Sequence, residues 1–330
     1  MNFDLYGCQL KILEKDEGHI FCQVPCADGE TGRMDIWQLF PGIVMSFNDF
    51  QARCFLSPAL GRAQVLEFNH CLRGRYECQF ENSTYAYLGP GEIALSRLDS
   101  LQRWSGFPLG EYYGISLLLD FAQGGEALER IWPGMGRNLK KIREKFWEAR
   151  CYYQCQPRGA AAGCLEGFYQ EIPGESRLNF YRLRTLELLE HLGALKVQEQ
   201  NYHAYLPRQK RQRMQQVRRL LEEDLEGRLR LEDVARAADL GLTALKEQFQ
   251  AVYGLSPMAF RRQVRMRRAA ELLEGSSRKV GEIAGLLGYE NASKFSRAFR
   301  SSVGESPAAY RSKRREKERL FGAEAAPRSR

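Results

Sequence analysis

The sequence predicts an α+β protein in two parts, a β-rich N-terminal half followed by a helical segment, and an all-helical C-terminal half. Three observations support this prediction. Short β-forming runs alternate with turn residues from about Met34 to Phe121. Beyond Gln123 the apolar residues recur at helical spacing. The last third of the chain repeats one motif and carries most of the basic charge.

The N-terminal half predicts a small barrel or double-sheet roll. Runs at 43–47, 64–68 and 75–80 are separated by turn residues, and the Gly89-Pro90-Gly91 turn leads into a further strand. Many short strands with regular turns are typical of such a roll. Aromatic residues on these runs, such as Phe47, could line a pocket, although core packing is the favoured interpretation.

The clearest helix of the middle segment is predicted over 178–197. Its apolar residues recur at alternating steps of three and four, a pattern used in helix pairing. Two interpretations stay open, pairing with a second copy of the chain or packing within the same chain. The seam consists of Leu178, Tyr181, Thr185, Leu188, Leu192 and Leu195, widened by Leu186 and Leu189.

Charge is divided unevenly along the chain. Residues 208–330 contain 28 Lys and Arg against 16 Asp and Glu, so they carry +12, whereas residues 1–207 carry −4. This asymmetry predicts a nucleic-acid or anionic-membrane partner for the C-terminal part alone. We identify neither a signal peptide nor an apolar run of membrane-spanning length, and therefore expect a cytoplasmic protein without a membrane partner.

The C-terminal part repeats one unit of two helices joined by a tight turn. Residues 234–260 and 283–310 align at an offset of 49 or 50, and Ser256-Pro257 corresponds to Ser306-Pro307. The first unit predicts helices over 214–225, 231–238 and 242–252. A long helix then runs from Ser256-Pro257 to Leu273, and about 17 residues give roughly 25 Å of rigid spacer.

The helix that follows the tight turn of each unit exposes side chains that suit DNA. Arg can bind guanine through two hydrogen bonds, Lys can bind guanine or phosphate, and Ser can bind either. Two such helices held on one spacer could enter successive major grooves. The predicted outward residues are Thr243, Lys246, Glu247 and Gln250 in the first unit, and Ala292, Ser293, Lys294 and Arg297 in the second.

The stretch 280–311 resembles the second helix-turn-helix signature of AraC/XylS-type transcription regulators, and about 100 residues, 214–315, share the resemblance. The resemblance implies sequence-specific binding of double-stranded DNA, with base-facing roles for the outward residues named above. It also implies RNA polymerase as a further partner, in activation or repression. The residues that carry it are Ile283-Ala284, Gly288-Tyr289, Phe295, Arg297, Phe299, Gly304, Ser306-Pro307 and Tyr310-Arg311, with Arg265, Ala269 and Leu272-Leu273 on the long helix.

The resemblance extends more loosely to the N-terminal half and to one branch of the family. The strands are similar to a cupin-like sensor domain that binds a small-molecule effector, and the 178–195 helix is similar to a segment that forms homodimers. Tyr289-Glu290-Asn291 with Ser293-Lys294-Phe295 is similar to the siderophore-responsive branch. The implied plan is a cupin-like sensor domain (1–123), a helical dimerisation or connector segment (124–200), a linker (201–213), a tandem helix-turn-helix domain (214–315) and a disordered basic tail (316–330).

Two residues depart from the signature. Gly241 precedes the first reading helix where Ser or Thr is usual, and Gly is a weaker cap. Glu290 stands before the second reading helix where Ser is common. Both departures lie at the starts of the reading helices and leave the implied fold unchanged.

All nine cysteines precede residue 165 at irregular spacing, which predicts reduced thiols and neither a disulfide framework nor a four-residue zinc set. No cofactor, metal or enzymatic activity is therefore predicted, and no ligand-binding residue is assigned. Two alternatives stay open. One is a regulator whose cysteines sense oxidation or a metal. The other is a DNA-alkyl-acceptor enzyme with a reactive cysteine in Asn69-His70-Cys71-Leu72-Arg73.

Overall fold

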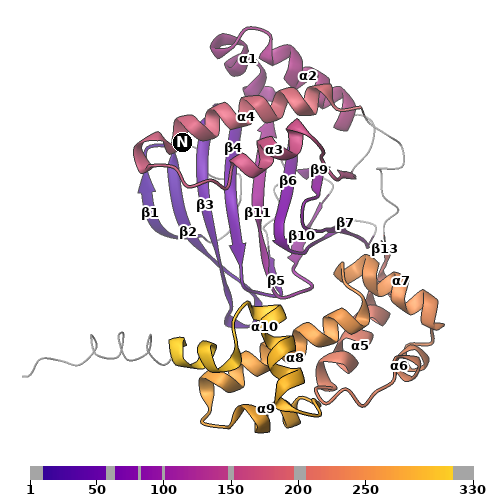
Figure 1. The fold of residues 1–330 in the computed structure, drawn as a ribbon. Coiled ribbons are helices and arrows are strands. Elements are labelled where there is room, and N and C mark those ends of the chain that lie inside the picture. The colour runs from indigo at the N-terminus through magenta and orange to yellow at the C-terminus, as the bar shows by residue number, and fades with distance from the viewer. Residues whose placement is uncertain are drawn as a thin grey trace, which may run out of the picture. The chain divides into compact units, whose positions relative to one another are not determined.

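A computed structural model describes residues 10–56, 64–80, 83–98, 101–147, 152–196 and 206–314. The chain forms two compact units, Met1–Arg208 and Gln209–Arg330, which we describe separately. Among the described residues, the first unit combines all the strands with four α-helices and the second is helical, so the predicted α+β fold class is confirmed (Figure 1). The predicted basic tail, 316–330, lies outside the described residues.

An antiparallel sheet of eight strands dominates the first unit, in the order β1-β2-β3-β4-β11-β6-β9-β12. Two of its strands precede Met34, so β structure begins earlier than predicted. A third, β12, lies in the segment predicted to be helical and pairs with β9. The strands are β1 (Lys11–Asp16), β2 (His19–Pro25), β3 (Thr31–Phe40), β4 (Ile43–Phe50), β6 (Val65–Gly74), β9 (Ile93–Arg97), β11 (Tyr112–Asp120) and β12 (Tyr152–Cys155).

A second, five-stranded sheet completes the predicted double-sheet roll, in the order β13-β8-β7-β10-β5. Pro207, placed in the linker by sequence, lies in the edge strand β13, where its missing N–H costs no ladder hydrogen bond. The strands are β5 (Cys54–Leu56), β7 (Tyr76–Phe80), β8 (Thr84–Leu88), β10 (Leu101–Gly106) and β13 (Leu206–Pro207).

The large sheet has an apolar core on each face because side chains alternate along each strand. On β4, Val44 and Phe50 enter the core between the two sheets. Ile43 and Met45 enter a second core beneath the helices. Four helices cover that second face (Figure 1): α1 (Phe121–Ile131), α2 (Met135–Phe146), α3 (Ala160–Gly167) and α4 (Arg177–Ala194).

The predicted pairing seam of α4 packs within its own chain. Tyr181, Leu188 and Leu192 expose 7%, 2% and 2% of their surface and belong to the core beneath the helices. Packing within the chain is therefore confirmed for this seam, and pairing with a second copy through this helix stays a prediction. Leu183 on the opposite face is 63% exposed, and the helix ends at Ala194, short of the predicted Val197.

The second unit is all-helical, as predicted. Its first helix begins at Arg208 instead of Met214, so the second half of the predicted linker is helical; residues 201–205 lie outside the described residues. Residues 307–314 are also helical. The helices are α5 (Arg208–Glu223), α6 (Leu231–Ala237), α7 (Leu242–Tyr253), α8 (Pro257–Gly275), α9 (Val280–Leu286) and α10 (Ala292–Val303).

The sequence repeat is also a repeat of backbone hydrogen bonds. In the first repeat, Leu240 N donates to Ala235 O at 3.0 Å. In the second repeat, Tyr289 N donates to Ala284 O at 2.9 Å. The reading helices α7 and α10 end at Gly254 and Gly304, both with positive φ, as the left-handed cap requires. The side chains of Ser256 and Ser306 then accept hydrogen bonds from the backbone N–H three residues ahead, at 3.2 and 3.3 Å.

Candidate nucleic-acid interface

The eight residues predicted to contact DNA all lie on the outside of α7 and α10. The inner face of α7 is held by Leu245 and Phe249, and that of α10 by Phe295 and Phe299, all of them fully buried. Burial of this face fixes the rotation of each helix, so the opposite face must meet solvent. The exposed residues are Thr243, Lys246, Glu247, Gln250, Ala292, Ser293, Lys294 and Arg297.

The start of α10 combines a strong cap with basic side chains. Asn291 Oδ1 accepts a hydrogen bond from Lys294 N at 2.8 Å, which satisfies one unpaired N–H of the first turn. The Lys294 ammonium contacts the Glu290 carboxylate, and this hydrogen bond lowers the pKa of Glu290. Arg297 is exposed and makes no ion pair with any residue that the structure describes. The Arg297 guanidinium is therefore available to DNA, whereas Lys294 must first leave Glu290.

The start of α7 is weaker. Gly241 occupies the cap position and offers no side-chain hydrogen bond. Gln250 Nε2 donates to Gly254 O at 2.7 Å, so this amide holds the end of its own helix. Lys246 and Glu247 are exposed with opposite charges, and the face of α7 is less basic than that of α10. Base contacts by these residues remain a prediction.

The two helix-turn-helix units pack against opposite ends of α8. Met266, Ala269 and Leu273 of α8 pack with Phe295 and Phe299 of α10 in one buried cluster. At the other end of α8, Phe260 packs against Phe249 and Tyr253 of α7, with ring centroids 5.4 and 5.6 Å apart. Both reading helices are thus anchored on one continuous helix.

A second connection runs through the loop between α5 and α6. Asp224 pairs with Arg261 of α8 at 3.3 Å, and both side chains are nearly fully buried. Arg265 of α8 lies between Gly227, where a Cβ would approach its Nη2 to 1.4 Å, and the Tyr289 ring, 5.9 Å from the centroid. Any side chain at Gly288 would meet Glu226 O at 1.9 Å. The turn of the second unit therefore packs directly on the loop of the first.

Arg300 is a candidate DNA contact that the sequence analysis missed. It is exposed and lies three residues after Arg297, on the same side of α10. Helical spacing from Arg297 was the available signal. Arg311, by contrast, donates to Leu273 O and Arg278 O, so it stabilises the domain.

A pocket of about 290 Å³ opens on the helix-covered side of the eight-stranded sheet. Asp35 and Asp49 supply carboxylates, and the Asp49 Oδ1 atom is buried with no hydrogen-bond partner among the described residues. Burial and then the charge of Asp49 raise the pKa of Tyr113. No spacing in the sequence indicated this site, although Phe47 was noted as a pocket candidate. The lining is Phe21, Arg33, Asp35, Phe47, Asp49, Tyr113, Phe168, Tyr169, Gln170 and Tyr181.

The interior between the two sheets contains a polar stripe. Asn48 Nδ2 donates to Ser116 Oγ at 2.8 Å, and Ser116 Oγ donates to Asn69 Oδ1 at 2.5 Å. Burial raises the pKa of Glu67 to about 7, and hydrogen bonds with Asn69 and Ser96 limit the rise. The stripe crosses strands β4, β11, β6 and β9, and its side chains form hydrogen bonds mainly with one another.

The seven described cysteines form no disulfide with one another. Burial raises the pKa of Cys22 and Cys26 to about 11 and that of Cys71 to about 12. Cys71 is fully buried, and burial in apolar surroundings makes a thiol a weak nucleophile, so the structure disfavours the reactive-cysteine alternative at Cys71. His70 beside it is buried, its Nδ1 lies 2.9 Å from the Tyr169 hydroxyl, and burial lowers its pKa to about 4.

Comparisons with known proteins agree with the C-terminal geometry. A family model described as a helix-turn-helix domain matches residues 234–313. The chain is 29% identical to the HTH-type transcriptional regulator ExsA of Pseudomonas aeruginosa over 44% of this chain and 52% of that protein. It is 31% identical to the Msm operon regulatory protein of Streptococcus mutans over 29% of this chain and 34% of that protein. The chain therefore spans about a third to a half of these relatives.

Among solved structures, the chain resembles an AraC-type transcriptional regulator from Chromobacterium violaceum. The identity is 23% and the TM-score 0.31, over 32% of this chain and 93% of that one. Within the described residues, no helix has the length and apolar character needed to cross a bilayer. From the family match and the duplicated fold, residues 234–313 of the C-terminal unit form a helix-turn-helix domain similar to those of transcription regulators.

Proposed function

We propose that the protein is a sequence-specific, effector-responsive transcription regulator that reads DNA with α7 and α10. The observation that carries the proposal is the pair of reading helices, anchored on α8 and presenting all eight predicted contact residues to solvent. Residues 208–330 carry a net charge of +12, which favours binding to the phosphate backbone. The direction of regulation, activation or repression, stays open.

Selection from a random duplex library, followed by fluorescence anisotropy, tests this proposal. We expect the full chain to bind a selected duplex at least ~10³-fold more tightly than a scrambled one, with affinity that falls steeply as salt rises. Equal binding to both duplexes would mean that the basic charge serves only non-specific attraction. The reading-helix assignment would then be wrong.

We further infer that the effector is a small cation that binds the aromatic pocket. The Asp49 carboxylate, whose Oδ1 has no partner among the described residues, lines the pocket with the rings of Phe47, Tyr113 and Tyr181. Asp35 also lines the pocket but is already bonded to His19, and Arg33 adds a positive charge, so Asp49 is the carboxylate that would bind the cation. Aromatic faces and carboxylates both attract cations, and a desolvated cation over an aromatic ring gains about 2 kcal/mol. Tyr181 comes from α4, so an occupied pocket would link the sheet to the last helix before the DNA-binding unit.

Choline and its neutral isostere 3,3-dimethyl-1-butanol form a matched pair of probes. All four tryptophans precede residue 150, so tryptophan fluorescence reports unfolding of the N-terminal compact unit only. Choline should raise the unfolding temperature, the neutral isostere should not, and Asp49→Asn should remove the effect. Glu126→Gln, an exposed change on α1, is the control. Equal effects of both probes, or no effect of choline, would exclude this pocket as a cation site without bearing on DNA binding.

A further inference from the structure

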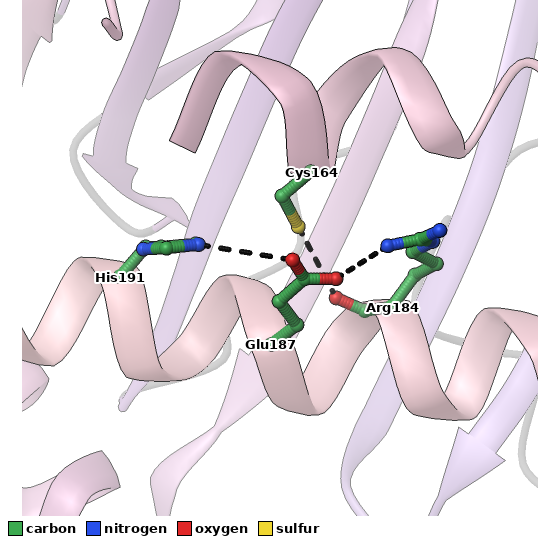
Figure 2. A network of polar contacts seen from close by, with 4 residues as sticks. All are labelled: Cys164, Arg184, Glu187 and His191. Carbon is green, nitrogen blue, oxygen red and sulfur yellow. Dashed lines mark hydrogen bonds and ion pairs between the residues drawn. The ribbon is translucent and has the colours of Figure 1, made fainter. Parts of the chain in front are cut away.

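Three metal-ligating side chains meet between α3 and α4. Cys164 projects from α3 toward α4, where Glu187 and His191 lie one helical turn apart (Figure 2). The thiol sulfur, a carboxylate oxygen and an imidazole nitrogen all lie within 4.8 Å of one another. Thiolate, imidazole and carboxylate are the ligand types that Zn²⁺ prefers. The spacing of 23 and 27 residues from the cysteine hid this set in the sequence.

The imidazole of His191 points to a missing ligand. Its Nε2 atom is buried and has no hydrogen-bond partner among the described residues. Glu187 Oε1 is 3.9 Å away, too far for a hydrogen bond. Buried polar atoms in native proteins are nearly always satisfied, and an unseen ion is one recognised explanation for an exception.

Arg184 holds the carboxylate in a suitable orientation. Its Nη1 binds Glu187 Oε2 at 2.6 Å, which leaves Oε1 facing His191 (Figure 2). The guanidinium is itself confined by Gly167 of α3, where a Cβ would meet Nε at 2.8 Å, and by the Phe180 ring 5.1 Å away. Such outer partners fix a ligand's geometry in known metal sites.

We propose that Cys164, Glu187 and His191 form a binding site for a divalent cation of the zinc class, which clamps α3 to α4. On binding, the Cys164 thiol loses its proton to solvent and forms a sulfur–metal bond, Glu187 contributes Oε1 and neutral His191 contributes Nε2. A thiolate and a carboxylate together balance the charge of the cation. Three protein ligands leave a fourth position for water or another donor, as in exchangeable sites.

Cobalt substitution tests the site in the full-length, reduced protein. Co²⁺ should give the thiolate-to-cobalt absorption band and the visible bands of a tetrahedral site, and Zn²⁺ should displace it. His191→Gln and Cys164→Ser should lower the Zn²⁺ affinity at least ~10²-fold, and Arg184→Gln roughly 10-fold to 100-fold. Glu190→Gln, exposed on the same helix, and Cys155→Ser should bind like the parent protein.

Two results would overturn the proposal. One is the absence of the thiolate–cobalt band in the parent protein. The other is unchanged Zn²⁺ affinity in both His191→Gln and Cys164→Ser. Since Cys164 is buried, a loss of binding in Cys164→Ser counts only if its circular dichroism matches the parent. His191 is half-buried, so its variant provides the independent check. Neither failure would affect the proposed DNA binding.

Discussion

The two helix-turn-helix units share one backbone plan but differ at the turn, the cap and the reading face. The first turn uses Asp239 and the second Gly288, both with positive φ. The first reading helix has Gly241 at its cap and the second Asn291. The second face also carries more positive charge. Under the proposed function, these differences predict that α10 contributes more to DNA recognition than α7.

The difference at the turn has a packing cause. Asp can adopt the left-handed conformation at modest cost, so Asp239 is tolerated where its side chain is exposed. At the equivalent position, Gly288 lies against the Glu226 carbonyl, and any Cβ would collide with it. The second turn therefore requires glycine because it also forms the contact between the two units.

Gly288→Ala should have the largest effect. Left-handed strain and the backbone collision together should destabilise the second helix-turn-helix unit by roughly 2–5 kcal/mol. Asp239→Gly should change stability by less than about 1 kcal/mol. Hydrogen–deuterium exchange of peptides from 280–314 and from 231–256, measured on the full chain, separates the two units.

Gly285→Ala is the matched control for Gly288→Ala. It lies three residues earlier on α9, where a Cβ meets nothing within 4 Å. Alanine there should stabilise the helix by roughly 0.5–1 kcal/mol. Equal exchange in Gly288→Ala and Gly285→Ala would mean that the turn does not couple the units.

Arg297→Ala should have the next largest effect, now on DNA affinity. Removing an arginine that binds a guanine should weaken the binding free energy by about 1–3 kcal/mol and relax the preference at one base pair. Lys246→Ala in the first unit should give a smaller loss, nearly uniform across sequences. Anisotropy with the selected duplex and its single-base variants measures both.

Arg268→Ala controls for the charge removed by Arg297→Ala. Arg268 is exposed on α8, outside the two reading helices, and pairs with Glu271 at 2.7 Å. Its removal should shift affinity slightly without changing base preference. If Lys246→Ala relaxed specificity more than Arg297→Ala, the first unit would be the main reader.

Much of the DNA-binding unit could be predicted because its determinants are local. Ser256-Pro257 marks a helix start, Gly254 marks a helix end, and Leu245 with Phe249 marks an inward face. Each signal acts within a few residues, and its repetition about 50 positions later supported it. The start of α5 at Arg208 was missed because a polar, arginine-rich helix has no apolar signal until Met214.

The N-terminal compact unit, Met1–Arg208, was less predictable because its features depend on residues far apart in sequence. β12 belongs to the sheet only through pairing with β9, more than 50 residues earlier. The seam on α4 fits an intrachain core as well as a coiled coil, and only the position of the sheet decides between them. The aromatic pocket and the Cys164 cluster likewise draw on separate elements, so no spacing rule identifies them.

The caps offer a finer comparison of the two units. Asn291→Ala should destabilise the start of α10 by about 1 kcal/mol, because Lys294 N loses its acceptor. Gly241→Ser should stabilise α7 by only a few tenths of a kcal/mol, roughly the difference between the two caps in known helices. A Cβ at Gly241 meets nothing within 4 Å, so the serine fits.

Hydrogen exchange in the first turn of each reading helix checks the cap effects. Protection should fall in Asn291→Ala for the start of α10 and rise in Gly241→Ser for the start of α7. A rise of the same size in Gly241→Ala would show that helix propensity, and not capping, distinguishes the two starts.

Glu290→Gln should have the smallest effect and the opposite sign. The carboxylate holds the Lys294 ammonium in the free protein and would repel DNA phosphates. Exposed ion pairs are weak, so freeing Lys294 should raise DNA affinity by only roughly twofold to fivefold at low salt. The gain should fade as salt rises and should disappear when Lys294 is also changed to Ala. A gain that persists in the double variant would instead mean that Glu290 acts on DNA directly, with Lys294 uninvolved in reading.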